Sequence, residues 1–504
     1  MMHFGEDNLT VISAQAAAGG NLLKRQAIKG VFFLGFRRIF IQIIITGANI
    51  ILARLLFPEV FGVFAIAMGF VSFMSIFSSL GLEPALIQKK EDPSKEELQT
   101  VFTFNFCLSC GIFLMTFFLS PLFFRFYQDQ LGAQGVFLLQ LLSLAIPLQI
   151  LKGISCVLLE RRLDYFRLTI GEVWEIIVLE VTTVVLVLLG FGVLSFVWGI
   201  ILSRFLGFIG FFFLAPWPVG LRFSLERVRG IIGFGTNFQL MTIIGGLNGA
   251  VVPIFVGKVS GTTGLGLVNW AGGLAAFPRG IPEIFGRLTF PVCARAQDDL
   301  KLFRTIIEKS IQLSCFATFP LIAIMAALAY PITVLVYTDK WLGGIPAFYF
   351  FSFQSIFLVV GGIFTQALLA FGEAKIVRNV TLFWAILQWV LTVPLVFKFG
   401  FTGLAVASAL VSSTSFLPLI YLRKKVEFEI ARHIWPYLLF SSVSGIVVFF
   451  LNQKYPSRGI IDLVLMLALG GLVYFAQVLL FKRVEIMEDT SEVKKILFDK
   501  LEEG

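Results

Sequence analysis

The feature that most restricts the fold of this chain is the recurrence of long apolar runs along nearly its whole length. About fourteen runs of roughly 20 apolar residues lie between residues 32 and 481, each long enough to cross a bilayer as a helix. Of the 504 residues, 58% are hydrophobic and only 14% are charged, and the mean hydropathy is +0.90. Because lipid does not tolerate unpaired backbone groups, the sequence predicts an all-α polytopic membrane protein.

The charges in the loops between these runs predict the topology. Basic segments such as KRQAIK, ERRLDYFR and LRFSLERVR alternate with loops that keep isolated cations such as Arg54 and Lys340. The positive-inside rule then places both termini in the cytoplasm. The net charge of +9 is dispersed through these loops, so topology explains it better than nucleic-acid binding does. The first 26 residues place acidic residues before any apolar core, so we expect a cytoplasmic tail there rather than a signal peptide.

The chain also contains an internal repeat. The segment from Leu119 lies over the segment from Ala329 without gaps and matches a proline, a tyrosine and an aspartate. Since each half holds six spans, both halves enter the membrane in the same sense, which is typical of parallel repeats around a central cavity in transporters. The predicted divisions are an N-terminal tail (1–29), helices one to six (30–214), a cytoplasmic linker (215–228), helices seven to twelve (229–422), two further helices (423–481) and a cytoplasmic tail (482–504).

The first hairpin resembles that of a known family. The opening ARLLFPEVFG and the close GLEPALIQ are similar to polysaccharide flippases, the O-antigen and exopolysaccharide repeat-unit exporters of the multidrug/oligosaccharidyl-lipid/polysaccharide (MOP) superfamily. The resemblance extends from about residue 29 to residue 481. It implies fourteen helices in a pattern of six, six and two, and residence in the bacterial cytoplasmic (inner) membrane.

The resemblance also implies a function. Family members move undecaprenyl-pyrophosphate-linked oligosaccharides from the inner to the outer leaflet by alternating access, for O-antigen, capsule or exopolysaccharide biosynthesis. The implied partners are this lipid-linked substrate, membrane lipids, and the polymerase and chain-length proteins of the pathway. A lipid II flippase and a multidrug or cation antiporter of the same superfamily remain alternatives. The short outside loops argue against a membrane glycosyl polymerase or ligase, so no enzyme activity is expected.

A charged, proline-rich stretch, AFPRGIPEIFGRLTFP, interrupts the eighth apolar run. Arg279 falls about 22 Å into that run, near the membrane centre, and Glu283 and Arg287 follow on the same helical face. A lipid-facing charge there would cost about 2.5–3.5 kcal/mol, so these residues are expected to face protein or water. We predict that Arg279 binds the substrate pyrophosphate, with a simple pairing of Arg279 and Glu283 as the alternative. The prolines predict a kinked helix.

Helix one offers a second polar face. Arg38, Gln42, Thr46 and Asn49 recur at helical spacing and turn away from lipid together. Arg38, Gln42 and Asn49 are therefore predicted to line the substrate cavity. Contact of Arg38 with an anionic lipid headgroup is the alternative.

Further charges lie inside helices four and five. Lys152 is a candidate cavity residue, and its pairing with a helix-five glutamate is the competing interpretation. Glu172, Glu175 and Glu180 are candidates for coupling transport to H+ or Na+, since burial of an unpaired carboxyl favours its protonated form.

One further pair is predicted from an overlay of the two halves. It sets Glu83 opposite Arg287, and we predict that these residues close a cytoplasmic gate.

The sequence offers no set of residues for a metal or catalytic site. Only two histidines occur, and the five cysteines lie in or beside apolar runs, where a small buried side chain is the expected role. No resident cofactor is therefore expected.

Overall fold

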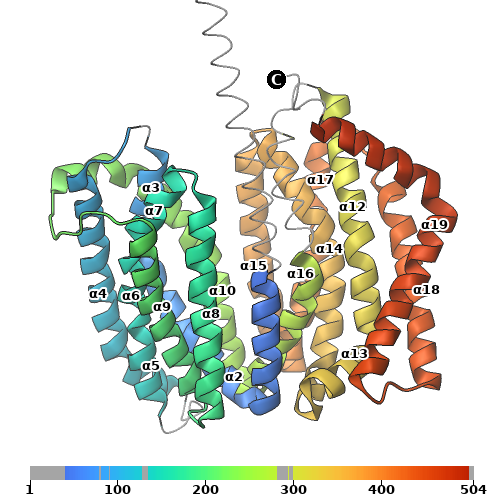
Figure 1. The fold of residues 1–504 in the computed structure, drawn as a ribbon, viewed down its shortest axis with the longest axis horizontal. Coiled ribbons are helices and arrows are strands. Elements are labelled where there is room, and N and C mark those ends of the chain that lie inside the picture. The colour runs from blue at the N-terminus through green and yellow to red at the C-terminus, as the bar shows by residue number, and fades with distance from the viewer. Residues whose placement is uncertain are drawn as a thin grey trace, which may run out of the picture. The chain divides into compact units, whose positions relative to one another are not determined.

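The computed structural model describes residues 40–78, 81–89, 91–127, 134–280, 293 and 299–498. Throughout these residues the regular elements are helices, which confirms the all-α prediction for the described chain (Figure 1). Eleven stretches of them are long and apolar enough to cross a membrane. The α8 helix (Tyr165–Leu188) is long enough but carries three glutamates, so it is not one of the eleven. The count of fourteen spans and the parallel repeat stay predictions.

The chain divides into two compact units. The first contains Met1–Leu52 and Val71–Ile243, and the second contains Ala53–Phe70 and Ile244–Gly504. The second unit thus includes a short piece of the first predicted half, while the predicted domain bounds themselves stay untested.

The described helices of the first unit pack side by side. The closest pairings join α8 to α9 and α4 to both α5 and α6. The described helices that lie wholly in this unit are η1 (Ile76–Ser78), α3 (Leu82–Gln88), α4 (Lys95–Phe126), α5 (Gly135–Ser143), α6 (Ala145–Leu151), α7 (Gly153–Arg161), α8 and α9 (Leu194–Leu214). Two helices have residues in both units: Phe40–Leu55, and α2 (Pro58–Ser75), most of which belongs to the second unit.

Local side chains set where several of these helices begin. Ser94 and Glu97 form a capping box at the start of α4, in which each side chain accepts a hydrogen bond from the other residue's backbone N–H. Asp164 caps α8 in a similar way by accepting from the Arg167 N–H. These caps fix where α4 and α8 begin.

The fourth predicted span is helical but broken. It consists of α5, α6 and α7, with junctions at Leu144 and Lys152. Pro147 lies inside α6, where it lacks a backbone donor, and Gly153 follows the second junction. The break places Lys152 between two helical segments.

The second unit is organised around α12 and α18. Its described core joins these two helices to α14, α17 and α19 through buried side chains such as Phe319, Phe364 and Tyr474. The remaining elements of the second unit, and the long helix that enters it, are α10 (Leu225–Ala276), η2 (Phe277–Arg279), α12 (Leu300–Ala327), α13 (Ala329–Ile332), η3 (Thr333–Tyr337), η4 (Asp339–Gly344), α14 (Ile345–Ala370), α15 (Ala374–Phe399), α16 (Thr402–Ser412), α17 (Leu417–Leu422), α18 (Ile430–Lys454) and α19 (Ile460–Phe498).

The segment Ala53–Phe70 is held in the second unit by two cations, each of which donates to backbone carbonyls within a few residues of the other. The Arg54 guanidinium donates to the carbonyl oxygens of Leu335 and of Val336, the latter at 2.8 Å, at the end of η3. Lys340 in turn donates to the Arg54 carbonyl at 2.8 Å, and the Trp341 indole donates to the Ala53 carbonyl at 2.9 Å. Each cation thus satisfies carbonyls that helical hydrogen bonding leaves open.

Glycines bring the backbones of α2 and α10 into contact in the same unit. A Cβ placed at Gly62 would lie 1.8 Å from the Thr262 carbonyl oxygen, and one at Gly266 would lie 1.8 Å from that of Pro58. Any larger residue at either glycine would push the two helices apart.

Many large apolar side chains remain on the outside of the helices. Phe118, Phe213 and Leu480 are each more than 70% exposed. Such faces are unfavourable in water but match the hydrocarbon core of a membrane.

Candidate functional site

Three charged side chains meet among the helices of the first unit. Lys152, at the junction of α6 and α7, contacts the Glu175 Oε2 of α8, while Arg204 of α9 donates from Nη1 to Glu175 Oε1 at 2.5 Å. Their side chains are 16%, 10% and 27% exposed, respectively, so all three are largely removed from solvent. Two cations therefore share one carboxylate, and this triad carries a net positive charge.

Glycines create the space that the triad occupies. A Cβ at Gly207, one turn after Arg204, would lie 3.2 Å from the Glu175 carboxyl carbon. One at Gly171 would lie 2.5 Å from the ring of Phe211, the ring over which Lys152 lies at 5.5 Å. The ammonium of Lys152 is thus held between a carboxylate and an aromatic face.

A second carboxyl, far from the triad in sequence, lies near it in space. Glu83 of α3 points at Gly153, where a Cβ would lie 2.2 Å from Glu83 Oε1. The Asn105 amide of α4 donates to the same oxygen at 3.5 Å. Burial raises the pKa of Glu83 above its ordinary value, and the nearby charge of Glu160 acts in the same direction.

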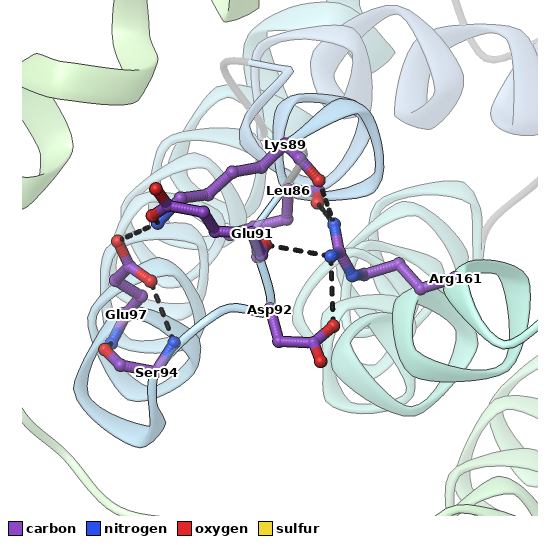
Figure 2. Close-up of polar contacts among 7 residues, drawn as sticks. All are labelled: Leu86, Lys89, Glu91, Asp92, Ser94, Glu97 and Arg161. Carbon is purple, nitrogen blue, oxygen red and sulfur yellow. Dashed lines mark hydrogen bonds and ion pairs between the residues drawn. The ribbon is translucent and has the colours of Figure 1, made fainter. Parts of the chain in front are cut away.

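A guanidinium clamp holds α3 in place against α7. Figure 2 shows Arg161, at the end of α7, reaching the loop that links α3 to α4. It donates to the carbonyl oxygens of Leu86 and Lys89 at 2.6 Å and of Glu91 at 2.9 Å, and it contacts Asp92 at 3.2 Å. Arg161 thereby caps α3 and fixes the helix that carries Glu83.

The same figure shows how the other side of the loop is held. Lys89 donates to Glu97 at 2.7 Å, and Glu97 also accepts from the Ser94 backbone. The loop is thus tied to α4 as well as to α7.

Arg279 lies at a break in its helix, as the prolines predict. The α10 helix is kinked at Gly261, whose φ of 75° favours glycine, and continues to Ala276 before the 3₁₀ turn η2, which contains Pro278 and Arg279. The turn packs against α12 and α14 within the second unit. Arg279 is half-buried there. Its predicted role with pyrophosphate stays a prediction.

Three residues of the predicted polar face of helix one are described: Gln42, Thr46 and Asn49. Gln42 donates to Thr46 at 3.2 Å, and Asn49 donates to the Ile45 carbonyl at 2.8 Å, so both bond within their own helix. Arg38, Glu283 and Arg287 lie outside the described residues, which leaves the predicted face and the predicted gate between Glu83 and Arg287 untested.

The three glutamates predicted in helix five all lie on α8. Glu175 pairs with Lys152, which is the competing interpretation of that lysine given by the sequence. Glu172 and Glu180 are half-buried on the same helix, and their predicted coupling roles stay predictions.

Sequence reasoning missed two members of this site. Arg204 lies in the middle of an apolar run just as Arg279 does, so the signal for it was present. Asn105 gave no such signal, because a single amide within an apolar helix is common and its partner Glu83 comes from another helix.

Comparison with known proteins decides the family. A model described as polysaccharide biosynthesis protein matches residues 51–346. The chain belongs to this family. The succinoglycan biosynthesis transport protein ExoT of Rhizobium meliloti (strain 1021) is 26% identical to this family member over 68% of each chain. The lipopolysaccharide biosynthesis protein WzxC of Escherichia coli (strain K12) is 24% identical over 59% of this chain and 60% of its own.

Solved structures share the fold of this polysaccharide biosynthesis protein. The lipid II flippase MurJ, in an inward closed conformation, matches with a TM-score of 0.75 and 15% identity, over 90% of this chain and 100% of its own. An inward-facing multidrug resistance transporter of the MATE family and MOP superfamily matches with a TM-score of 0.57 and 15% identity, over 84% of this chain and 100% of its own. The family match confirms the resemblance to a polysaccharide biosynthesis family, the two solved structures show the shared fold, and this family member is a multi-pass membrane protein.

Proposed function

We propose that this protein flips undecaprenyl-pyrophosphate-linked oligosaccharide repeat units from the inner to the outer leaflet of the bacterial cytoplasmic membrane by alternating access. The repeat units would serve O-antigen, capsule or exopolysaccharide synthesis and would pass to polymerase and chain-length proteins. The observation that carries the proposal is the buried triad of Lys152, Glu175 and Arg204, found in a chain of the polysaccharide biosynthesis family. Transport named for the relative ExoT supports it.

The triad suits an anionic head group. One carboxylate cannot neutralise two cations, so a positive charge remains where isolated ions are unfavourable. Within the described chain, Arg204 forms no further hydrogen bond, so its remaining N–H groups are available to phosphate oxygens. Arg279 of the second unit is a separate candidate for pyrophosphate binding, on the sequence evidence given above.

Deletion and complementation test this proposal. A strain that lacks the gene should accumulate an undecaprenyl-linked glycan on the inner leaflet, and the wild-type gene should clear it. Arg204→Ala and Arg279→Ala should each reduce this rescue by about tenfold or more, the effect of losing roughly one charge-assisted hydrogen bond.

Arg162→Ala is the matched control. Arg162 is an exposed arginine of the first unit, and its loss should leave rescue intact. Failure of any lipid-linked glycan to accumulate would exclude the flippase function, and full rescue by Arg204→Ala and by Arg279→Ala would exclude the roles assigned to these two arginines.

The likeness to MurJ supports lipid II as a second candidate substrate. The same strain separates the two, because loss of a lipid II flippase would raise lipid II and impair growth. Loss of a polysaccharide flippase would instead raise a lipid-linked repeat unit and remove a surface polymer.

A further inference from the structure

The surroundings of Glu83 are suited to a neutral carboxyl. Its oxygen lies against Gly153, and Asn105, which is 1% exposed, offers it one N–H at 3.5 Å, the outer limit of a hydrogen bond. The Asn105 Oδ1 is buried and has no hydrogen-bond partner among the described residues. An ionised Glu83 would be weakly stabilised, and that oxygen would lack a donor.

A proton satisfies both groups at once. A protonated carboxyl is a donor as well as an acceptor, and an amide can turn so that its oxygen faces that donor. The Glu83 O–H would then donate to Asn105 Oδ1. The arrangement is complete only with the proton bound.

The charged groups around Glu83 come from two of the elements packed near it. From α7, Glu160 repels a negative charge at Glu83, and the thiol of Cys156 lies nearby. From the junction of α6 and α7, Lys152 attracts one, but its ammonium already contacts Glu175. From α4, the facing side chain is the neutral Asn105.

We propose that Glu83 is a proton-binding site that competes with Glu175 for Lys152. With Glu83 protonated, Lys152 remains on Glu175, and the four residues Glu83, Lys152, Glu175 and Arg204 carry a net charge of about +1. When the O–H bond of Glu83 breaks and the proton leaves to water, a second carboxylate faces the same lysine. The net charge falls to about zero, and Lys152 is drawn toward Glu83.

This site links protons to an anionic ligand. Because protonation leaves the cluster positive, it strengthens binding of an anion at Arg204 and Lys152, and by linkage the anion strengthens binding of the proton. The use of this linkage in transport rests on the proposed function, whereas protonation of Glu83 does not depend on that function.

Infrared difference spectroscopy of the purified full-length protein tests the site without any substrate. Raising the pH should remove a protonated-carboxyl band from the wild type. The band should be absent from Glu83→Gln, which keeps the size of the side chain. It should persist in Glu59→Gln, where an exposed glutamate is replaced. A wild-type spectrum unchanged in Glu83→Gln would overturn the proposal.

Lys152→Met tests the competition itself. Loss of the attracting cation should move the Glu83 transition to higher pH by about one unit or more. If the transition did not move, Lys152 would not exchange between Glu175 and Glu83, and the proposed competition for Lys152 would be overturned. Since both measurements use protein alone, a failed complementation experiment would remove the flippase function and leave this result standing.

Discussion

Single glycines decide where this membrane protein tolerates charge. Gly153 and Gly207 lie against Glu83 and Glu175, and Gly171 lies against the ring that supports Lys152. In each case the missing side chain leaves room for a group from another helix. A helix that carries charge in a membrane must find such partners, because lipid offers none.

Gly171→Ala should therefore destabilise the protein. The new methyl group would lie 2.5 Å from the Phe211 ring, and forced repacking of this kind costs about 1–3 kcal/mol. Gly111→Ala on α4 is the control, since nothing lies within 4 Å of its Cβ position, and it should be neutral or gain about 0.5–1 kcal/mol. Thermal unfolding in detergent measures both. Equal stability of the two variants would contradict this role for Gly171.

The raised pKa of Glu83 predicts how stability changes with pH. Because the folded state holds this proton more tightly than the unfolded state, the contribution is complete below the ordinary glutamate pKa. It is lost as the pH rises through the folded-state pKa. Glu83→Gln should remove this loss and unfold at an equal or higher temperature than wild type at neutral pH. If Glu83→Gln lowered the unfolding temperature by the same amount at every pH, the assignment of this proton to Glu83 would be contradicted.

Among the helices of the first unit, hydrogen bonds from an arginine side chain to backbone carbonyls hold α3 against α7. Arg161 holds three backbone carbonyls, one in the last turn of α3 and two in the loop after it, and hydrogen bonds from a charged donor contribute about 1.5–3 kcal/mol. We expect Arg161→Ala to loosen this loop and speed hydrogen exchange of residues 86–92. Arg162→Ala should leave exchange unchanged. Arg161→Lys should recover only part of the protection, because an ammonium lacks the planar fork.

The helices themselves were predictable from sequence, whereas their contacts were not. The apolar runs at residues 376–397 and 434–451 predict α15 and α18 to within a few residues, since a helix needs only local hydrogen bonds to satisfy its backbone. The pairing of Lys152 with Glu175 remained one of two interpretations, because it depends on how α7 and α8 are rotated about their axes. Arg204 was missed for the same reason. The breaks at Leu144 and Lys152 were hidden within one continuous apolar run.

At the scale of the whole chain, the contacts of Ala53–Phe70 join segments that lie far apart in sequence. Arg54 and Lys340 are 286 residues apart, and each caps carbonyls next to the other. Neither cation is matched by a carboxylate in these contacts, so their strength should not depend on pH over the range in which acids titrate. Lys340 also lies 4.7 Å from the Phe57 ring centre, which adds a cation–π contact.

Reciprocal capping makes the two cations dependent on each other, and a double-mutant cycle measures that dependence. Arg54→Ala and Lys340→Ala should each lower the free energy of unfolding by about 1–3 kcal/mol, because each leaves carbonyls without donors. The double variant should lose less than the sum, since either change releases the same segment. Lys398→Ala, at an exposed lysine, should have no effect. Strict additivity would mean that the two caps act separately and would contradict their dependence on each other.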